Sequence, residues 1–104
     1  MRRINVSELA ELVKSDIPEL LDVREPWEFD ICQIEGSINL PMGQIPGGIE
    51  QIDRSKETVV ICHHGVRSLQ VIQYLSQQGF TNLINLDGGI DAWARQLDIN
   101  MAVY

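Results

Sequence analysis

The sequence predicts an α/β fold, in which a mainly parallel sheet has helices on both faces. Short apolar segments rich in β-branched residues alternate along the chain with longer segments of helical periodicity. Strands that alternate with helices pair in parallel, and the connecting helices then cover both faces of the sheet. The 104 residues, 44% of them hydrophobic, are enough for one domain with its own core, and no repeat or linker divides residues 1–104.

Five segments carry the strand pattern. Residues 20–23 (LLDV) and 58–61 (TVVI) are short and mostly apolar, which is typical of buried strands. Residues 37–40 (SINL) end at a proline, and residues 83–86 (LINL) form the last clear strand. Residues 4–6 (INV) are expected to add a short edge strand.

The first two helices have recognisable starts. Residues 8–14 follow Ser7, which we expect to cap the helix by accepting a hydrogen bond from a free N–H group of the first turn. Residues 27–31 follow Pro26, and proline is favoured in a first turn because its missing N–H group would have no partner there. Both segments therefore predict short helices between strands.

The last two helices are marked by glycine. In residues 67–78 the apolar side chains fall on one face, and Gly79 is a suitable C-cap after which Phe80 packs back on the last turn. Residues 90–97 follow two glycines and form the final predicted helix. The Gly/Pro-rich residues 42–48 are expected to turn into a short helix and are not a domain boundary.

Charge and composition exclude several classes of partner. The net charge is −7 and no basic stripe is present, so we expect neither a nucleic-acid partner nor binding to an anionic membrane. The N-terminal arginines are not followed by an uninterrupted apolar run, so we predict no signal peptide and no membrane helix. The two cysteines, Cys32 and Cys62, form no CxxC motif, and a structural disulfide is not expected. The cytoplasm is the expected compartment.

Residues 61–68 (ICHHGVRS) raise three alternatives: a metal site, an activated nucleophile, or a cysteine that is only a small buried side chain. Cys62 ends the most apolar strand and Arg67 opens the most regular helix. Open parallel sheets bind ligands at the carboxyl ends of their strands. Gly65 lets the loop curl so that its N–H groups point inward and form a nest for an anion.

These features suit a negative group held next to Cys62. A helix N-terminus carries partial positive charge, and Arg67 adds a fixed charge with forked donors. Such surroundings stabilise the thiolate, which is the reactive form of cysteine. The loop therefore favours an activated nucleophile over a buried structural cysteine, although strand-end cysteines often are only that.

A metal site is disfavoured. Adjacent residues rarely converge on one ion, and a tetrahedral site would need nearly every cysteine and histidine, including the distant Cys32. We therefore predict no metal and no cofactor. His63 and His64 are expected to line the loop or face solvent, where they contribute partial positive charge and N–H donors.

Three segments resemble the motifs of one family: LDVREPWEFDICQIEGSINLP (21–41), ICHHGVRS (61–68) and LDGGIDAW (86–93). They occur in the expected order and spacing, so the chain from residue 4 onward resembles a single-domain rhodanese, a sulfurtransferase. The resemblance implies a five-stranded parallel sheet flanked by helices. It also implies that Cys62 is the catalytic nucleophile and that the remaining loop residues bind substrate: His63, His64, Gly65, Val66, Arg67 and Ser68.

The resemblance further implies a two-step transfer. The Cys62 thiolate attacks the sulfane sulfur of thiosulfate or of a related persulfide donor, and the resulting persulfide rests among the loop N–H groups. Cyanide or a thiol, which a protein could supply, then takes the sulfur. Arg67 is expected to hold the loop and add positive charge, and Ser68 to donate to the helix or cap it.

Other residues of these motifs are interpreted as structural. Asp22 and Arg24 should fix the loop after their strand through hydrogen bonds. Gly88 and Gly89 should permit the tight turn into the last helix, and Trp93 should pack in the core beneath it.

Three positions leave alternatives open. Trp27 either rims the pocket or packs against neighbouring residues. Cys32 stands where relatives often have glycine, so we expect a buried small side chain, with a sulfur relay as the alternative. His63 and His64 replace the arginine, lysine or small polar residues common in the family. Neutral histidines hold dianionic thiosulfate less well than fixed cations, so a persulfide from a protein or a small thiol is at least as credible a donor.

Two other functions compete. Cell-cycle dual-specificity phosphatases share the fold, but their loop between cysteine and arginine is one residue longer and forms a wider cradle for phosphate. The second is a sulfur-carrier or protein-binding module without turnover of its own, which could retain Cys62 to deliver sulfur to a partner protein.

Overall fold

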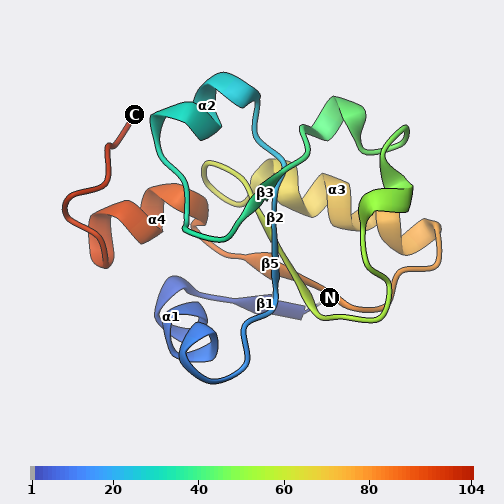
Figure 1. The fold of residues 1–104 in the computed structure, drawn as a ribbon, viewed down its shortest axis with the longest axis horizontal. Coiled ribbons are helices and arrows are strands. Elements are labelled where there is room, and N and C mark those ends of the chain that lie inside the picture. The colour runs from blue at the N-terminus through green and yellow to red at the C-terminus, as the bar shows by residue number, and fades with distance from the viewer. Residues whose placement is uncertain (1) are drawn as a thin grey trace.

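Five parallel strands form one sheet in the order β1-β5-β4-β2-β3 (Figure 1). The computed structural model describes residues 2–104. The predicted parallel sheet is therefore confirmed, with β4 at its centre. The strands are β1 (Arg2–Ile4), β2 (Glu19–Asp22), β3 (Ile38–Asn39), β4 (Thr58–Ile61) and β5 (Leu83–Leu86).

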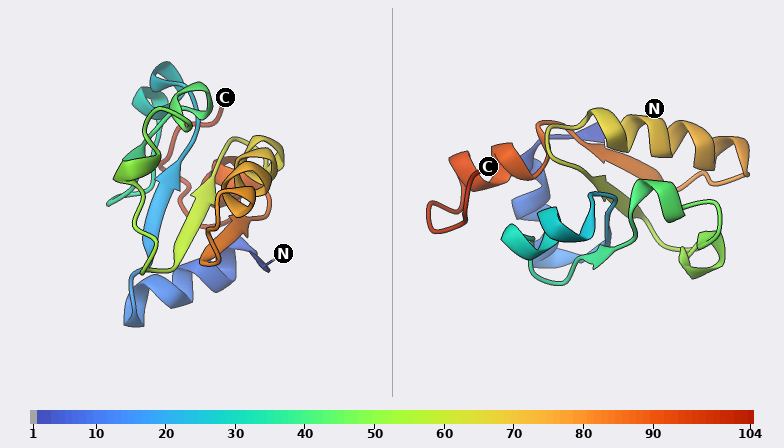
Figure 2. Two further views of the ribbon diagram at one scale, coloured as in Figure 1. Left: turned by 90° about the vertical axis from the view of Figure 1, so that its right-hand side faces the viewer. Right: turned by 90° about the horizontal axis from the view of Figure 1, so that it is seen from above.

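Helices lie on both faces of this sheet, as predicted. In Figure 1, α1 and α4 lie to the left of the strands and α3 to the right, and the view from above in Figure 2 keeps this division. Among residues 2–104, no helix is long and apolar enough to cross a membrane. The helices are α1 (Val6–Ser15), α2 (Pro26–Ile31), α3 (Val66–Gln77) and α4 (Gly89–Gln96), with short 3₁₀ helices η1 (Met42–Gln44) and η2 (Ile49–Gln51).

The core consists of one apolar cluster on each face of the sheet. Alternate residues of β4 enter opposite clusters, because successive side chains of a strand point to opposite faces. Val59 and Ile61 pack with α1 and α4, whereas Val60 and the following Cys62 pack with α3. Every residue of β4 is buried, which explains why its sequence is so apolar.

The N-terminal boundary differs from the prediction in two ways. The edge strand β1 ends at Ile4, and Val6 already belongs to α1 with its side chain buried. Asn5, not Ser7, caps α1. The Asn5 side chain accepts the Glu8 N–H at 2.8 Å, and the Glu8 carboxylate accepts the Asn5 N–H at 2.9 Å. This reciprocal capping box satisfies two free donors, which a cap at Ser7 would not do.

The predicted end of α3 is confirmed. Gly79 has a left-handed φ of +93°, and its N–H group donates to the Ser76 carbonyl at 3.1 Å. The Phe80 N–H donates to the Leu75 carbonyl at 3.1 Å, and Phe80 is buried against the helix. These two bonds define a Schellman motif, whose left-handed position favours glycine.

The loops after β2, β4 and β5 leave the same edge of the sheet, since parallel strands share their carboxyl ends. They lead into α2, α3 and α4, respectively. The residues that begin these three helices are therefore brought together although they are far apart in sequence. This edge is the place where parallel sheets bind ligands.

A buried ion pair organises the first of these loops. Asp22 and Arg24 are fully buried, and the guanidinium donates to the Asp22 carboxylate at 2.7 Å. It also donates to the backbone carbonyls of Glu28 and Cys32, at 3.1 and 2.6 Å. Burial alone would lower the pKa of Arg24, but hydrogen bonds to Asp22 and Tyr104 raise it, so the side chain stays charged. The structural roles expected for Asp22 and Arg24 are thus borne out.

We expect Asp22→Ala to lower the free energy of unfolding by about 3–5 kcal/mol, because Arg24 would keep a buried charge without a partner. Urea unfolding at pH 7 measures this loss. Asp16→Ala removes an exposed carboxylate and should cost less than about 1 kcal/mol. Equal losses in the two variants would contradict the role given to the ion pair.

Candidate active site

The predicted cysteine loop connects β4 to α3 and is curled around the Cys62 sulfur. Gly65 is the N-cap of α3 and has a left-handed φ of +101°. Its N–H group donates to Cys62 Sγ at 3.0 Å. A side chain at Gly65 would be strained in this conformation. The N–H groups of the first turn of α3 have no partner within the helix and begin at the same loop.

The start of α4 holds the loop from the other side. The Ile90 N–H donates to the Cys62 carbonyl at 2.9 Å, and the Asp91 N–H donates to the His63 carbonyl at 3.0 Å. Gly89 lies so close that a Cβ atom there would overlap both carbonyl groups. Gly88 and Gly89 both have positive φ and permit the tight turn into α4, as expected. Gly89 in addition makes room for the loop backbone.

Cys62 is 1% exposed, and its sulfur lies between a donor and a hydroxyl group. The donor is the Gly65 N–H described above, and the hydroxyl is that of Ser68, whose Oγ lies 3.4 Å from Sγ. Ser68 is in the first turn of α3 and is fully buried. It therefore contacts the sulfur directly, in addition to its place at the start of the helix.

Asn85 determines the direction of the hydrogen bond between Ser68 and Cys62. The Asn85 amide NH₂ donates to the Asp87 carboxylate at 2.9 Å, which leaves its carbonyl oxygen facing Ser68. That oxygen accepts only, so the single hydroxyl hydrogen of Ser68 points to Asn85. The Ser68 oxygen then presents lone pairs to Cys62, and the resting thiol donates to it.

Arg67 is paired with Glu28 of α2. Its guanidinium donates to the two carboxylate oxygens at 2.7 and 2.8 Å, in the bidentate geometry that arginine favours. The pair joins the start of α3 to α2 and so holds the loop. Arg67 keeps its charge near Cys62, but the Glu28 carboxylate is paired with it, so part of the positive charge expected at the loop is balanced.

Glu28 is the centre of a wider polar network. Its carboxylate also accepts from the Tyr104 hydroxyl at 2.9 Å, and that hydroxyl accepts from Arg24 at 3.0 Å. The hydrogen bond from Arg67 is the main reason that the pKa of Glu28 falls to about 2. Burial raises the pKa of Tyr104 to about 12, so the phenol stays protonated.

The two histidines of the loop have different surroundings. His63 is half-buried, and its ring stacks on the Tyr104 ring with 3.8 Å between centroids and 2° between planes. Burial, followed by the neighbouring His64, lowers the pKa of His63, which is therefore neutral at pH 7. His64 is 62% exposed, with Nε2 3.9 Å from the Asp91 carboxylate. His63 therefore supplies no fixed positive charge to the loop.

The cations around the loop are already paired with carboxylates. Within residues 2–104, Arg54 is the one cation without an ion pair, and it stacks on Phe80 and donates to a backbone carbonyl. The loop therefore offers N–H donors but no unpaired arginine or lysine. The paired cations are Arg2, Arg3, Lys14, Arg24, Lys56, Arg67 and Arg95.

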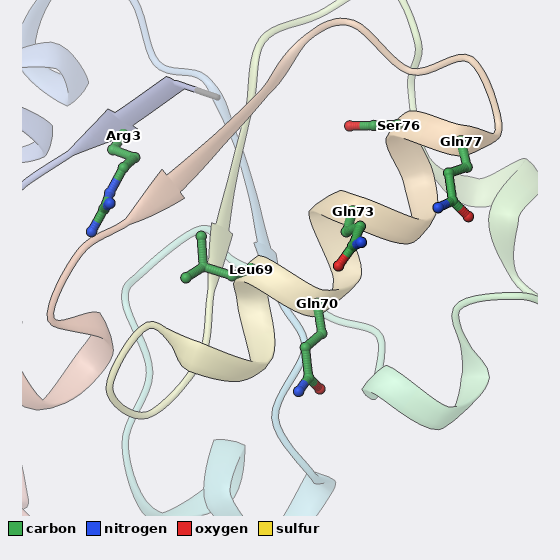
Figure 3. A pocket seen from close by; sticks show the side chains of 6 residues that line it. All are labelled: Arg3, Leu69, Gln70, Gln73, Ser76 and Gln77. Carbon is green, nitrogen blue, oxygen red and sulfur yellow. The ribbon is translucent and has the colours of Figure 1, made fainter.

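A hollow on the outer surface of α3 lies apart from this loop (Figure 3). The side chains of Gln70, Gln73 and Gln77 project there from α3, and Arg3 reaches it from β1. No cysteine or histidine lines it. Its one hydroxyl, that of Ser76, has no histidine or carboxylate in the lining to activate it, so we assign the chemistry to the Cys62 loop.

The structure brings together most of the predicted loop residues around Cys62, but not all of them. Val66 is 63% exposed and begins α3 on its outer side.

Outside the loop, Trp27 is also largely exposed and meets the Tyr104 ring edge-on, with 6.1 Å between centroids. Trp93 is only half-buried against the core. Cys32 is buried, as expected.

Three residues of the site were not identified from the sequence. Asn85 is a polar residue in the middle of a buried strand, and that exception was a usable signal. Glu28 and Tyr104 gave none, because their contacts to Arg67 and Arg24 depend on the packing of α2 and the C-terminal residues.

Comparison with known proteins places these features in one family. Residues 5–96 match the model of the rhodanese-like domain. The chain is 33% identical to the thiosulfate sulfurtransferase GlpE of Shewanella oneidensis, over 88% of this chain and 91% of that protein. It is 38% identical to the putative sulfurtransferase YtwF of Bacillus subtilis, over 89% and 90% of the two chains. A crystal structure of a rhodanese-related protein from Thermoplasma volcanium superposes with a TM-score of 0.85 at 37% identity, over 93% and 94%.

We expect Glu28→Gln to lower the free energy of unfolding by about 2 kcal/mol at pH 7. Because the folded pKa of about 2 lies below the ordinary 4.5, the contribution of Glu28 is complete above pH 4.5 and is lost as the pH falls toward 2. The difference between wild type and variant, measured by urea unfolding from pH 7 to pH 2, should shrink over that interval. Asp30→Asn, an exposed change in the same helix, is the control. A difference that does not vary with pH would exclude the ion pair as its cause.

We expect Ser68→Ala to leave the rate of Cys62 alkylation by iodoacetamide at pH 7.5 unchanged or to raise it. The Ser68 oxygen accepts from the thiol, so its loss removes nothing that stabilises the thiolate. Alkylation is followed by intact mass, with Ser76→Ala on the same helix as the control. A tenfold slower reaction, about 1.4 kcal/mol, would show that Ser68 instead donates to the sulfur.

Proposed function

Because the chain belongs to the rhodanese-like family, we propose that it is a sulfurtransferase that carries sulfane sulfur as a persulfide on Cys62. Residues 1–104 would act as one rhodanese-like domain. The observation that carries this proposal is the position of Cys62 Sγ, which accepts the Gly65 N–H at 3.0 Å where α3 begins. The donor and the partial positive charge of the helix favour negative charge on sulfur at this point.

The reaction has two displacement steps at sulfur. The Cys62 thiolate attacks the sulfane sulfur of the donor, a new S–S bond forms, and the donor's own bond to that sulfur breaks. Sulfite leaves from thiosulfate, or a thiolate leaves from a persulfide, and either takes the electron pair. Cyanide or a thiolate then attacks the outer sulfur of the Cys62 persulfide, which restores the Cys62 thiolate and yields thiocyanate or a new persulfide.

The resting thiol must lose its proton before the first step. In the resting arrangement that proton is directed to Ser68, whose own hydrogen is directed to Asn85. Transfer of the proton to solvent leaves the sulfur with the Gly65 N–H as its donor. The persulfide formed afterwards has no proton on its inner sulfur, so that sulfur no longer donates to Ser68.

The charges around the loop favour a persulfide of a small thiol or a protein at least as much as thiosulfate. Thiosulfate is a dianion, and a chain of net charge −7 repels it unless local cations compensate. Arg67 is balanced by Glu28, and His63 is neutral at pH 7. A persulfide that carries one negative charge or none needs less compensation.

A carrier or binding module without turnover is the alternative. The observation that favours it is the burial of Cys62, which leaves 1% of the residue exposed and fits delivery by a docked protein better than free collision with small anions. A phosphatase is less suitable, since the four residues from His63 to Val66 form a shorter loop than phosphatases use. Cys32 and Cys62 are both free thiols, which is consistent with a reducing compartment such as the cytoplasm.

We expect wild type treated with thiosulfate, or with cysteine persulfide as a less negative donor, to gain the mass of one sulfur atom that reductant removes. Intact mass spectrometry measures the gain. Cys62→Ser should show none, while Cys32→Ser should load like wild type, because Cys32 takes no part in the transfer. We expect the persulfide donor to load Cys62 faster than thiosulfate does.

Two outcomes would overturn parts of this proposal. If loading persists in Cys62→Ser but disappears in Cys32→Ser, the nucleophile is Cys32 and the role proposed for Cys62 is wrong. Loading of Cys62 with transfer to protein thiols but negligible thiocyanate formation would favour the carrier over the enzyme.

A further inference from the structure

A second group of potential ligands lies beside the loop. His63 and His64 follow the nucleophilic cysteine, and Asp91 lies in the first turn of α4. One potential ligand atom from each of these residues lies within 4.8 Å of the other two. The sequence disfavoured a metal because adjacent residues rarely converge on one ion and because the chain has only two cysteines and two histidines. The tertiary structure supplies a carboxylate as the third ligand.

His63 provides an independent observation at this group. Its Nε2 atom is buried and has no hydrogen-bond partner among residues 2–104. Buried polar atoms are nearly always hydrogen-bonded, so an unpartnered imidazole nitrogen calls for an explanation. A neutral imidazole carries a lone pair on one of its two nitrogens, and that lone pair can bind a metal.

The three side chains are held near one another by backbone contacts and still have freedom to adjust. The Asp91 N–H donates to the His63 carbonyl at 3.0 Å, so the loop and α4 move together. His64 is 62% exposed and Asp91 18% exposed, which leaves the group open to solvent. Ligands at about 2.0–2.2 Å from zinc lie closer together than 4.8 Å, so metal binding requires these side chains to move closer, and His64 is exposed enough to do so.

We propose that His63, His64 and Asp91 form a site for a divalent transition metal of the zinc class. Two imidazoles and one carboxylate suit Zn²⁺, Co²⁺ or Ni²⁺, whereas Mg²⁺ and Ca²⁺ prefer oxygen ligands alone. Three protein ligands leave a fourth position for water or a thiolate. The site lies at the edge of the Cys62 loop, but it depends on neither the persulfide chemistry nor the Cys62 sulfur.

Arg95 competes with a bound metal for the Asp91 carboxylate, which gives a variant expected to bind the metal more tightly. It lies one turn along α4 and donates to both oxygens of the Asp91 carboxylate, at 3.0 and 3.1 Å. This ion pair competes with a metal for the carboxylate. Removal of Arg95 should therefore strengthen metal binding, whereas removal of a ligand should weaken it.

The test is titration of the full chain with Co²⁺, followed by its visible absorption, and with Zn²⁺ by calorimetry. The background carries Cys62→Ser and Cys32→Ser, so that thiolates contribute nothing and failure of the sulfur chemistry has no influence. We expect one ion per chain and the intense absorption of a four-coordinate Co²⁺ site. His64→Ala and Asp91→Asn should each weaken binding by about tenfold or more. Arg95→Gln should tighten it severalfold.

Asp98→Asn, which removes a carboxylate outside the group, is the matched control and should leave the affinity unchanged. His64 is exposed, so its replacement does not threaten the fold, and circular dichroism checks each variant. Absence of saturable binding would overturn the proposal. So would affinity that is the same in wild type, His64→Ala and Asp91→Asn, or Arg95→Gln that weakens binding.

Discussion

The contact between the Cys62 loop and the start of α4 is the constraint on which the site depends. Two consecutive loop carbonyls accept hydrogen bonds from the Ile90 and Asp91 N–H groups, which have no partner inside their own helix. The backbones approach so closely that position 89 must be glycine. This single contact fixes the loop relative to β5 and satisfies two helical donors. In the loop so held, the Gly65 N–H donates to the sulfur.

Around this contact, the charges are arranged to cancel. Arg67 is balanced by Glu28, Arg95 by Asp91 and Arg24 by Asp22. Ion pairs of this kind hold the loop and the flanking helices in one geometry, but they leave little free charge for an incoming anion. Stabilisation of a bound sulfur anion then rests on oriented N–H groups, which act at short range and are unaffected by the net charge of the chain.

A chain of hydrogen bonds from Asp87 through Asn85 to Ser68 determines which side of the Cys62 sulfur faces an acceptor. Each link has a fixed direction, because the carboxylate accepts only and the amide must donate to it. The Cys62 sulfur consequently lies between one donor, the Gly65 N–H, and one acceptor, the Ser68 oxygen. Such a cysteine is held in place by both contacts and is shielded from solvent by burial.

Much of this protein was determined by local sequence. The parallel sheet, the Schellman end of α3 at Gly79 and the place of Cys62 at the end of the most buried strand follow from periodicity, from glycine and from the carboxyl-end rule. These features depend on neighbours within a few positions, or on burial of a whole segment, and a sequence displays both.

The tertiary structure alone decided which groups meet across loops. Glu28 with Arg67, Tyr104 with His63, and Asp91 with the two histidines are separated by many residues in the chain and meet at one edge of the sheet. The cap of α1 at Asn5 was also a matter of geometry, because Asn5 and Ser7 are both acceptable caps by residue type. Contacts of this kind depend on how α2, α4 and the C-terminal residues pack, and no local pattern encodes that packing.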